Sequence, residues 1–343
     1  MISRLLKPIS LVSVLLLLSF QPSFAQKDDE KGSATVATPI LWQHPGNIGS
    51  RDLFYGPGAA DVAPVPPFVF VEEDKDGESP KFKVIDARRV IWSVKLGPEA
   101  QAETVATRLV WAVGYFAEEA YYFDKVKVES LPRLSRGQEH VRRDSGEVYG
   151  ARFEPRREGI RKAGTWDWNK NPFAGTKELS GLKVIMILLN NYDARSENNK
   201  VLVSNDTATN QMAARYVVTD LGASLGRAGG LGGKRSKNDL EDYLSTRFVM
   251  GVEDGAVEFD YDTRPTKLGM VSVLYPPYYK GEVKKEKSMR GIPVEHARWI
   301  GSLLSQLSAD QLRDAFRAAG YEARTMEEYV RAIRLRISQL TRL

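Results

Sequence analysis

Three side chains between residues 190 and 222 have types and spacing that could support phosphoryl transfer. Asp193 is followed five residues later by Asn198, and a short strand then ends at Asp220, where Gly222 relieves the turn. Carboxylate and amide oxygens are the hard ligands that Mg²⁺ prefers, and a further carboxylate can orient a hydroxyl and take its proton. The pattern predicts that Asp193 faces an acceptor hydroxyl while Asn198 and Asp220 reach one metal ion.

The same residues also fit an ordinary loop. Asp-Leu-Gly is most often a turn, and an Asp followed five residues later by an Asn occurs by chance in most chains of this length. Asn198 and Asn199 are adjacent, so either amide could be the metal ligand. Residues elsewhere in the chain must supply the rest of a site.

Lys95 and two glutamates upstream could supply it. Lys95 ends the predicted strand Val90–Leu96, where a lysine is usually an edge charge, but the next helix carries Glu99 and Glu103. Glu103 lies beside the apolar stripe of that helix, so its carboxylate could pair with Lys95 and hold the ammonium on phosphates. Glu99, one turn earlier, is the alternative partner.

Hydrophobic spacing predicts the elements that position Lys95. Alternating apolar residues indicate strands at 68–71, 82–85, 90–96 and 121–128. A helix opens at Pro98, where a missing N–H costs nothing, and ends at Gly114. This part of the chain is therefore rich in strands and contains one helix.

The second half of the chain is predicted to be mainly helical. A strongly apolar helix begins at Thr176 and delivers the chain to Asn190. Ser308 with Gln311, and Thr325 with the glutamate three residues on, have the spacing of capping boxes, and Gly320 is a helix stop. The apolar stripe of the last helix consists of Val330, Ile333, Ile337 and Leu340.

Two irregular stretches carry many basic residues or glycines. Residues 133–164 are rich in Arg and read either as a solvated insertion or as a surface for an acidic or phosphorylated partner. Residues 226–237 form a glycine-rich loop. Its GGLGGKRS run departs from a P-loop at Ala228 and Arg235, so we do not assign it to phosphate binding.

The first residues have the features of a secretory leader. Arg4 and Lys7 precede the apolar run Ile9–Phe20, and small residues lead to a cleavage position after Ala25. The run is too short to span a membrane, and no later stretch is long enough either. We expect export to the periplasm or beyond, with no transmembrane span in the mature chain.

Composition excludes several other classes of protein. Losing Arg4 and Lys7 takes the formal net charge from +5 to +3, which is too little to indicate a nucleic-acid partner. The chain has no cysteine and only three, widely separated histidines, so a zinc site is not expected. Without disulfides the protein depends on its hydrophobic core.

The run Val94-Lys95-Leu96, with the segment from Glu103 to Gly114, resembles the "VK…E…A..LA..LG" pattern of atypical kinases. These include the HipA-type, phosphatidylinositol and CotH-type spore-coat kinases, and their Asp-Asn-Asp segment is similar too. The resemblance implies an α+β, bilobal protein-kinase-like fold. Its small amino-terminal lobe would be β-rich with one helix, and its carboxy-terminal lobe mainly helical.

The resemblance also implies roles for individual residues. Lys95 would bind the phosphates of ATP, Glu103 would brace it, Asp193 would be catalytic, and Asn198 and Asp220 would hold Mg²⁺. Gly56 and Gly58, in the segment Phe54-Tyr-Gly-Pro-Gly58, are the best candidates for a loop that covers the nucleotide.

The sequence departs from the pattern of these kinases at three positions. Tyr192 stands immediately before Asp193, where no His or Arg is found. Arg195 replaces the His of HipA-type and lipid kinases, and Pro57 removes an N–H that a phosphate cradle would use.

The expected function is that of an exported phosphotransferase that uses ATP and Mg²⁺, with a protein, lipid or sugar hydroxyl as acceptor. A kinase-fold binding protein without catalysis and an unrelated periplasmic structural protein are the alternatives. The expected segments are a signal peptide at 1–25, a disordered tether at 26–48, an amino-terminal lobe at 49–132, and a carboxy-terminal lobe at 133–343 that includes the basic insertion 133–164 and the glycine-rich loop 226–237.

Overall fold

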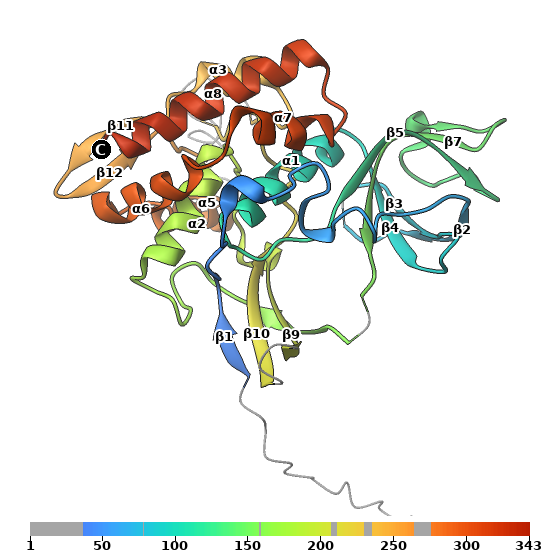
Figure 1. Cartoon of the computed structure of the whole chain (residues 1–343), viewed down its shortest axis with the longest axis horizontal. Coiled ribbons are helices and arrows are strands. Elements are labelled where there is room, and N and C mark those ends of the chain that lie inside the picture. Colours follow the sequence, from blue (N-terminus) through green and yellow to red (C-terminus); the bar gives the residue numbers. More distant parts are fainter. Residues whose placement is uncertain (1–36, 78, 158, 207–210, 230–234, 264–275) are drawn as a thin grey trace, which may run out of the picture. The chain divides into compact units, whose positions relative to one another are not determined.

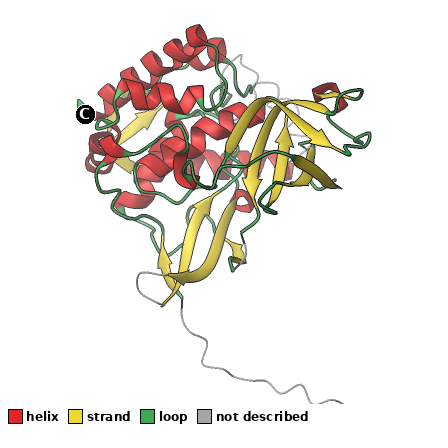
Figure 2. Ribbon diagram, turned by 45° about the vertical axis from the view of Figure 1, so that its right-hand side comes forward, coloured by secondary structure: helices red, strands yellow, loops and turns green. Residues whose placement is uncertain are grey.

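The computed structural model describes residues 37–343, except 78, 158, 207–210, 230–234 and 264–275 (Figure 1). The expected signal peptide and the first part of the tether, together residues 1–36, lie outside the described residues, as does the middle of the glycine-rich loop. The described part is a mixed α+β structure with three sheets (Figure 2).

The largest sheet has six strands in the order β4-β3-β2-β5-β7-β6. An additional pairing between β4 and β7 closes five of these strands into a ring, to which β6 is appended. Buried aromatic residues from several strands, including Phe68, Phe82, Trp92 and Phe153, fill its interior. The strands are β2 (Phe68–Asp74), β3 (Lys81–Ile85), β4 (Ile91–Leu96), β5 (Tyr121–Glu129), β6 (Val141–Arg142) and β7 (Glu147–Pro155).

Alternation along β4 decides which of its side chains face this interior. Trp92 and Val94 point into the aromatic core, so alternation places Lys95 on the opposite face of the strand. The strands expected at 68–71, 82–85, 90–96 and 121–128 are confirmed as β2, β3, β4 and β5.

Helix α1 (Glu99–Ala112) follows β4 and is confirmed with Pro98 at its N-cap. Most of its residues are buried because it packs in a second, larger core with the helices of the carboxy-terminal half. Those helices are α2 (Lys177–Leu188), α3 (Leu240–Ser245), α5 (Pro276–Ser288), α6 (Val294–Leu304), α7 (Ala309–Arg317) and α8 (Ala323–Thr341). Figure 1 shows α2, α6, α7 and α8 grouped on the side away from β2 and β3.

A four-stranded sheet, β1-β10-β9-β8, extends from the helices (Figure 1). Its strands are β1 (Thr38–Ile40), β8 (Arg161–Thr165), β9 (Asn199–Asp206) and β10 (Gln211–Val218). A small third sheet contains β11 (Val249–Glu253), β12 (Ala256–Phe259) and β13 (Ile292–Pro293). The carboxy-terminal half is therefore less helical than the sequence predicts.

Two predicted boundaries are wrong. The expected lobe boundary after residue 132 cuts through the six-stranded sheet, because β7, inside the supposed basic insertion 133–164, pairs with β4, β5 and β6. The expected tether at 26–48 includes β1, which pairs in parallel with β10, and the buried Leu41. A three-residue strand is too short to give a sequence pattern.

Of the two predicted capping boxes, one is confirmed and one is wrong. Ser308 and Gln311 form the expected capping box at the start of α7. Thr325 lies inside the first turn of α8, whose N-cap is Glu322, so the second capping box is wrong. The apolar stripe expected for the last helix is buried as predicted.

Candidate functional site

A polar pocket of about 280 Å³ lies where the six-stranded sheet, α1 and the end of β10 meet. Four basic and four acidic side chains line it. Of the residues that the sequence singles out, Lys95, Glu103, Asn198 and Asp220 all line this one pocket.

Lys95 is the centre of the pocket's ion pairs. Its Nζ lies 3.1 Å from Glu103 Oε2, 2.7 Å from Asp220 Oδ1 and 2.7 Å from Glu99 Oε2. Burial alone would lower the pKa of Lys95, but the carboxylates of Glu103, Asp220 and Glu99 raise it well above its ordinary value. The ammonium is therefore charged at any physiological pH and can attract anions.

Glu103 is fully buried and joins two cations on neighbouring strands. Register between β4 and β7 places Arg152 opposite Lys95, and Arg152 Nη2 lies 2.9 Å from Glu103 Oε1. Burial would lower the pKa of Arg152, but Glu103 and Glu154 raise it. Since each Glu103 oxygen faces a different cation, the carboxylate is held in one orientation. Arg152 was not predicted as part of the site, because only the strand register places it opposite Lys95.

Glu99 connects the pocket to two loops. Besides Lys95 it pairs with Lys237, at the end of the glycine-rich loop, and accepts a hydrogen bond of 2.8 Å from Ser79 Oγ. Burial would raise the pKa of Glu99, but Lys95, Lys237 and Ser79 lower it to about 2. A Cβ on Gly222 would lie 2.7 Å from Glu99 Cβ, so this close approach requires glycine.

Strand pairing brings Asn198 and Asp220 to the same edge. The antiparallel register pairs Asn199 with Val218, so Asn198 and Asp220 both lie just past the paired ends. Thr219 donates from its backbone N (2.9 Å) and its hydroxyl (2.8 Å) to the carbonyl of Asn198. These bonds fix the loop against the strand end that carries Asp220.

The two adjacent asparagines have different surroundings. Asn198 lines the pocket, and its Nδ2 donates to Asp193 Oδ2 at 3.0 Å. Asn199 is fully buried and donates to the carbonyl of Trp166 at 3.0 Å. Of the two alternatives, Asn198 is therefore the amide that faces the pocket. Asp193 is linked to the pocket through Asn198, and its Oδ1 lies 2.6 Å from Arg195 Nε.

Asp220 has an unusual backbone. Its φ is +56°, in the left-handed region that non-glycine residues rarely adopt, and its side chain is 51% exposed. Such conformations cost free energy and recur at functional sites, because surrounding contacts must hold them. Here they direct the carboxylate toward Lys95.

Gly56 and Gly58, the residues expected to cover a nucleotide, do not line the pocket. Both are buried in a short 3₁₀ turn that packs against α1, where Arg108 donates to the carbonyl of Phe54. A Cβ at Gly56 would lie 3.1 Å from Arg108 Cγ, and one at Gly58 would lie 2.0 Å from Tyr121 Oη. These glycines serve packing, and their assignment to nucleotide binding is not supported by their position.

The turn between β2 and β3 lies at the pocket instead. Gly77, with φ of +70°, and Ser79 contribute to its lining, together with Lys81 at the start of β3. Neither Gly77 nor Ser79 was among the predicted site residues. Gly77 and Ser79, two residues apart between two antiparallel strands, were the signal that could have identified this turn.

Two further carboxylates, Glu118 and Glu154, line the pocket. Burial and the neighbouring Glu154 raise the pKa of Glu118 well above its usual range. Burial also raises the pKa of Glu154, although Arg152, 3.1 Å from its Oε2, opposes this. Burial and mutual repulsion therefore disfavour two full negative charges at these carboxylates.

Residues 222–226 also match the G-x-S-x-G pattern of a hydrolase nucleophile. Ser224 is fully buried, however, and its hydroxyl accepts a hydrogen bond of 3.0 Å from Asn191 Nδ2. A hydroxyl enclosed in this way cannot meet a substrate. The motif has a structural role here.

The described residues were searched for a metal-binding cluster and for a membrane-spanning helix. There, no group of three or more His, Cys, Asp or Glu side chains is arranged to hold a metal ion. Asn198 and Asp220 place an amide and a carboxylate in the lining of one pocket, and such oxygens would suit an ion whose remaining ligands are phosphate oxygens and water. Among the helices of the same ranges, none is long and apolar enough to cross a bilayer.

No protein-family model and no curated protein matches this chain. Among solved structures, it is similar to the crystal structure of a Helicobacter pylori proinflammatory kinase, CtkA. The identity is 12%, the alignment covers 80% of this chain and 99% of that chain, and the TM-score is 0.34. At that score, any functional conclusion depends on the contacts within this chain.

Proposed function

We propose that this chain is an exported phosphotransferase with a bilobal, protein-kinase-like fold that uses ATP and Mg²⁺. One observation carries the proposal: Lys95 lies within 3.1 Å of Glu103 and within 2.7 Å of Asp220, on three separate elements. Asn198, from a fourth element, lines the same pocket. A cation held by a buried carboxylate beside two metal-binding oxygens is the arrangement that phosphoryl transfer requires.

Each side chain has a distinct part in this proposal. Lys95 would bind phosphate oxygens, and Glu103 would keep Lys95 in place because Arg152 fixes its other oxygen. Asn198 and Asp220 would hold Mg²⁺, which neutralises the charge that develops on the transferred phosphoryl group. Asp193 would orient the acceptor hydroxyl and receive its proton.

Binding of phosphates requires a rearrangement of the outer contacts. Lys95 already faces three carboxylates, so Asp220 and Glu99 must yield part of their contact to a nucleotide. Glu99 retains Lys237 and Ser79 as partners when it releases Lys95. Gly77 and Ser79, at the β2–β3 turn, would then cover the phosphates.

A nucleotide-binding protein without catalysis is the second candidate. It is favoured by Arg195, whose Nε lies 2.6 Å from the carboxylate of Asp193 and competes with an acceptor hydroxyl for it. Export also favours it, because little ATP is present outside the bacterial membrane. In either case the exposed Arg142 and Arg156 of the 133–164 stretch would suit an acidic partner.

Thermal unfolding of the protein with and without nucleotide tests the proposal. We expect saturating ATP with Mg²⁺ to raise the Tm by about 5 °C. Asp220→Asn should remove the Mg²⁺-dependent part of this shift, and Lys95→Met should remove the whole shift. Lys127→Met, at an exposed residue of β5, is the matched control and should behave as the unmodified protein.

Transfer of the γ-phosphate separates the two candidates. Slow ATP hydrolysis that is lost in Asp193→Asn supports the enzyme, whereas a Tm shift without any hydrolysis supports the binding protein. Failure of every nucleotide to change the Tm would exclude both.

A further inference from the structure

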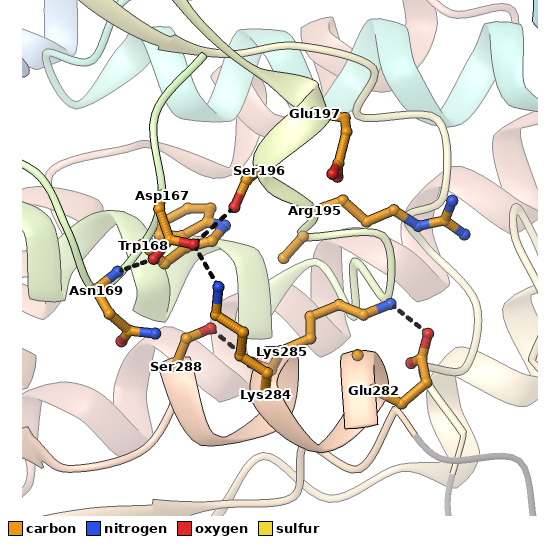
Figure 3. A pocket seen from close by; sticks show the side chains of 12 residues that line it. Asp167, Trp168, Asn169, Arg195, Ser196, Glu197, Glu282, Lys284, Lys285 and Ser288 are labelled. Atoms are coloured by element: carbon orange, nitrogen blue, oxygen red, sulfur yellow. Dashed lines mark hydrogen bonds and ion pairs between the residues drawn. The ribbon is translucent and has the colours of Figure 1, made fainter. Parts of the chain in front are cut away.

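A second pocket, of about 290 Å³, is lined in part by the residues that follow Asp193 in the chain (Figure 3). Residues 167–169 and 194–197 form one wall, and the second half of α5 forms the other. One segment therefore contributes to both pockets: Asn198 lines the Lys95 pocket, and the residues from Ala194 to Glu197 line this one.

Direct contacts join the second pocket to Asp193. Arg195, on the pocket wall, lies 2.6 Å from the Asp193 carboxylate. Lys285 of α5 donates at 2.9 Å to the carbonyl of Tyr192, the residue before Asp193. A ligand in this pocket would displace or engage the groups that surround the carboxylate.

The charge of this region differs from that of the Lys95 pocket. A shallower hollow continues the pocket along α5 and shares Asn169 and Lys284 with it. Five basic and three acidic side chains line the two hollows together. Lys280, Lys284 and Lys287 follow helical spacing on one exposed face of α5, so they present their ammonium groups together.

Most of the acidic groups in the second pocket are already neutralised. Asp167 accepts from Lys284 Nζ at 2.8 Å and from Ser196 Oγ at 3.1 Å, as Figure 3 shows. Burial would raise the pKa of Asp167, but Lys284, Asn169 and Ser196 lower it to about 2. Glu282 pairs with Lys285 at 3.0 Å and with Arg235. The exposed Lys280 and Lys287 therefore give this region a positive potential.

Trp168 adds a donor to the pocket wall. It is 3% exposed, and its Nε1 has no hydrogen-bond partner among the residues that the structure describes. A buried N–H without an acceptor costs free energy, which an acceptor-rich ligand in the pocket would offset.

We propose that this second pocket binds the acceptor, and that the acceptor is a small hydroxyl compound with a phosphate or carboxylate group. This inference rests on the proposed phosphotransferase function. The pocket's volume suits a ligand of about monosaccharide size, at the low end of the range for ligand sites. The lysines of α5 attract the anionic group, and Asp193 receives the hydroxyl.

The proposed reaction moves the γ-phosphoryl group of ATP to the acceptor hydroxyl. The acceptor hydroxyl oxygen forms a bond to the γ-phosphorus of ATP, and the bond from that phosphorus to the β–γ bridging oxygen breaks. The hydroxyl proton passes to Asp193, and ADP leaves with the bridging oxygen. Arg195 must first release Asp193, which an anionic ligand that attracts its guanidinium would promote.

Binding of glycerol 3-phosphate without nucleotide tests the inference, because it carries both a hydroxyl and a phosphate. The indole N–H signal of Trp168 is the reporter in an NMR titration, and its loss in Trp168→Phe assigns it. We expect a saturable shift of this signal and a Kd that rises about tenfold in Lys280→Glu/Lys287→Glu. Lys75→Glu/Lys127→Glu, the same charge change at exposed sites near the six-stranded sheet, should leave the Kd unchanged.

Vesicles that contain phosphatidylglycerol form the second arm. Binding to vesicles without binding of free glycerol 3-phosphate would show that the phosphate group recognised by the pocket belongs to a lipid headgroup. A saturable response to neither, or to an acidic peptide alone, overturns the inference. The titration uses no nucleotide. Failure of the ATP test with glycerol 3-phosphate still bound would therefore remove the phosphotransferase function and leave an anion-binding pocket.

Discussion

Near Lys95, one of two glutamates and one of two adjacent asparagines is buried more deeply than the other. Glu103 and Asn199 are fully buried, whereas Glu99 and Asn198, one turn or one residue away, are partly exposed. The buried members contact groups of the scaffold, namely Arg152 and the carbonyl of Trp166. The outer members contact loops and groups that a ligand could replace. The buried residues therefore hold the pocket in shape, whereas the partly exposed ones would give up contacts to a bound ligand.

Replacing Glu103 should have the largest effect on stability. Glu103→Ala leaves Lys95 and Arg152 buried without their shared carboxylate, and losing one partner of a buried ion pair costs about 3–5 kcal/mol. Denaturant unfolding measures this free energy. Glu99→Ala, on the same helix, is the matched control and should cost less than half as much. Equal losses would mean that depth does not distinguish the two glutamates.

Replacing Asn199 should come second. Asn199→Ala removes the hydrogen bond to the carbonyl of Trp166 inside the core, so we expect a loss of about 1–3 kcal/mol in the free energy of unfolding. Its nucleotide-dependent Tm shift should persist. If Asn199→Ala abolished that shift at unchanged stability, Asn199 would be the metal ligand instead of Asn198.

Glu99 should make part of the stability depend on pH. Its pKa is about 2 in the folded protein, against a reference value of 4.5, so the folded state favours the charged form. The resulting stabilisation is complete above pH 4.5 and is lost as the pH falls toward about 2. Glu99→Gln should therefore reduce the drop in unfolding free energy between pH 5 and pH 3, measured in urea. A drop identical to that of the unmodified protein would show that Glu99 is not held by Lys95 and Lys237.

Replacing Asn198 should have the smallest effect on stability. Asn198→Ala should change the free energy of unfolding by less than about 0.5–1 kcal/mol, because the residue is only partly buried and its carbonyl bonds to Thr219 remain. The informative measurement is the Mg²⁺-dependent part of the ATP-induced Tm shift, which should fall. If Asn198→Ala lowered the free energy of unfolding as much as Asn199→Ala does, the two asparagines would not differ in structural role.

Local patterns in the sequence predicted most elements around the site. Alternation gave β2 to β5, and the three- and four-residue spacing of apolar residues gave α1 and the last helix. Lys95, Glu103, Asn198 and Asp220 were identified because each lies at the end of such an element or on its core-facing side. All four line one pocket.

Features that depend on contacts between distant segments were missed. The place of β7 in the sheet and the contact of Arg152 with Glu103 depend on pairing with distant strands, so neither was predicted. Gly56 and Gly58 were predicted to form a nucleotide-binding loop. In the structure Gly56, with a positive φ, packs against Arg108, and Gly58 packs against Tyr121. The depth of Glu103 relative to Glu99 also depends on what α1 packs against.

The closed ring of strands has a consequence for how the site comes into existence. β4 and β7 are neighbours in the ring but are separated along the chain by α1, β5 and β6. Lys95 consequently has no settled surroundings until synthesis has passed Pro155. Until then β4 and β5 each present an unpaired edge, which is prone to pairing with other chains. Contacts between such distant segments also slow folding. The ring must therefore be complete before the Lys95 pocket exists.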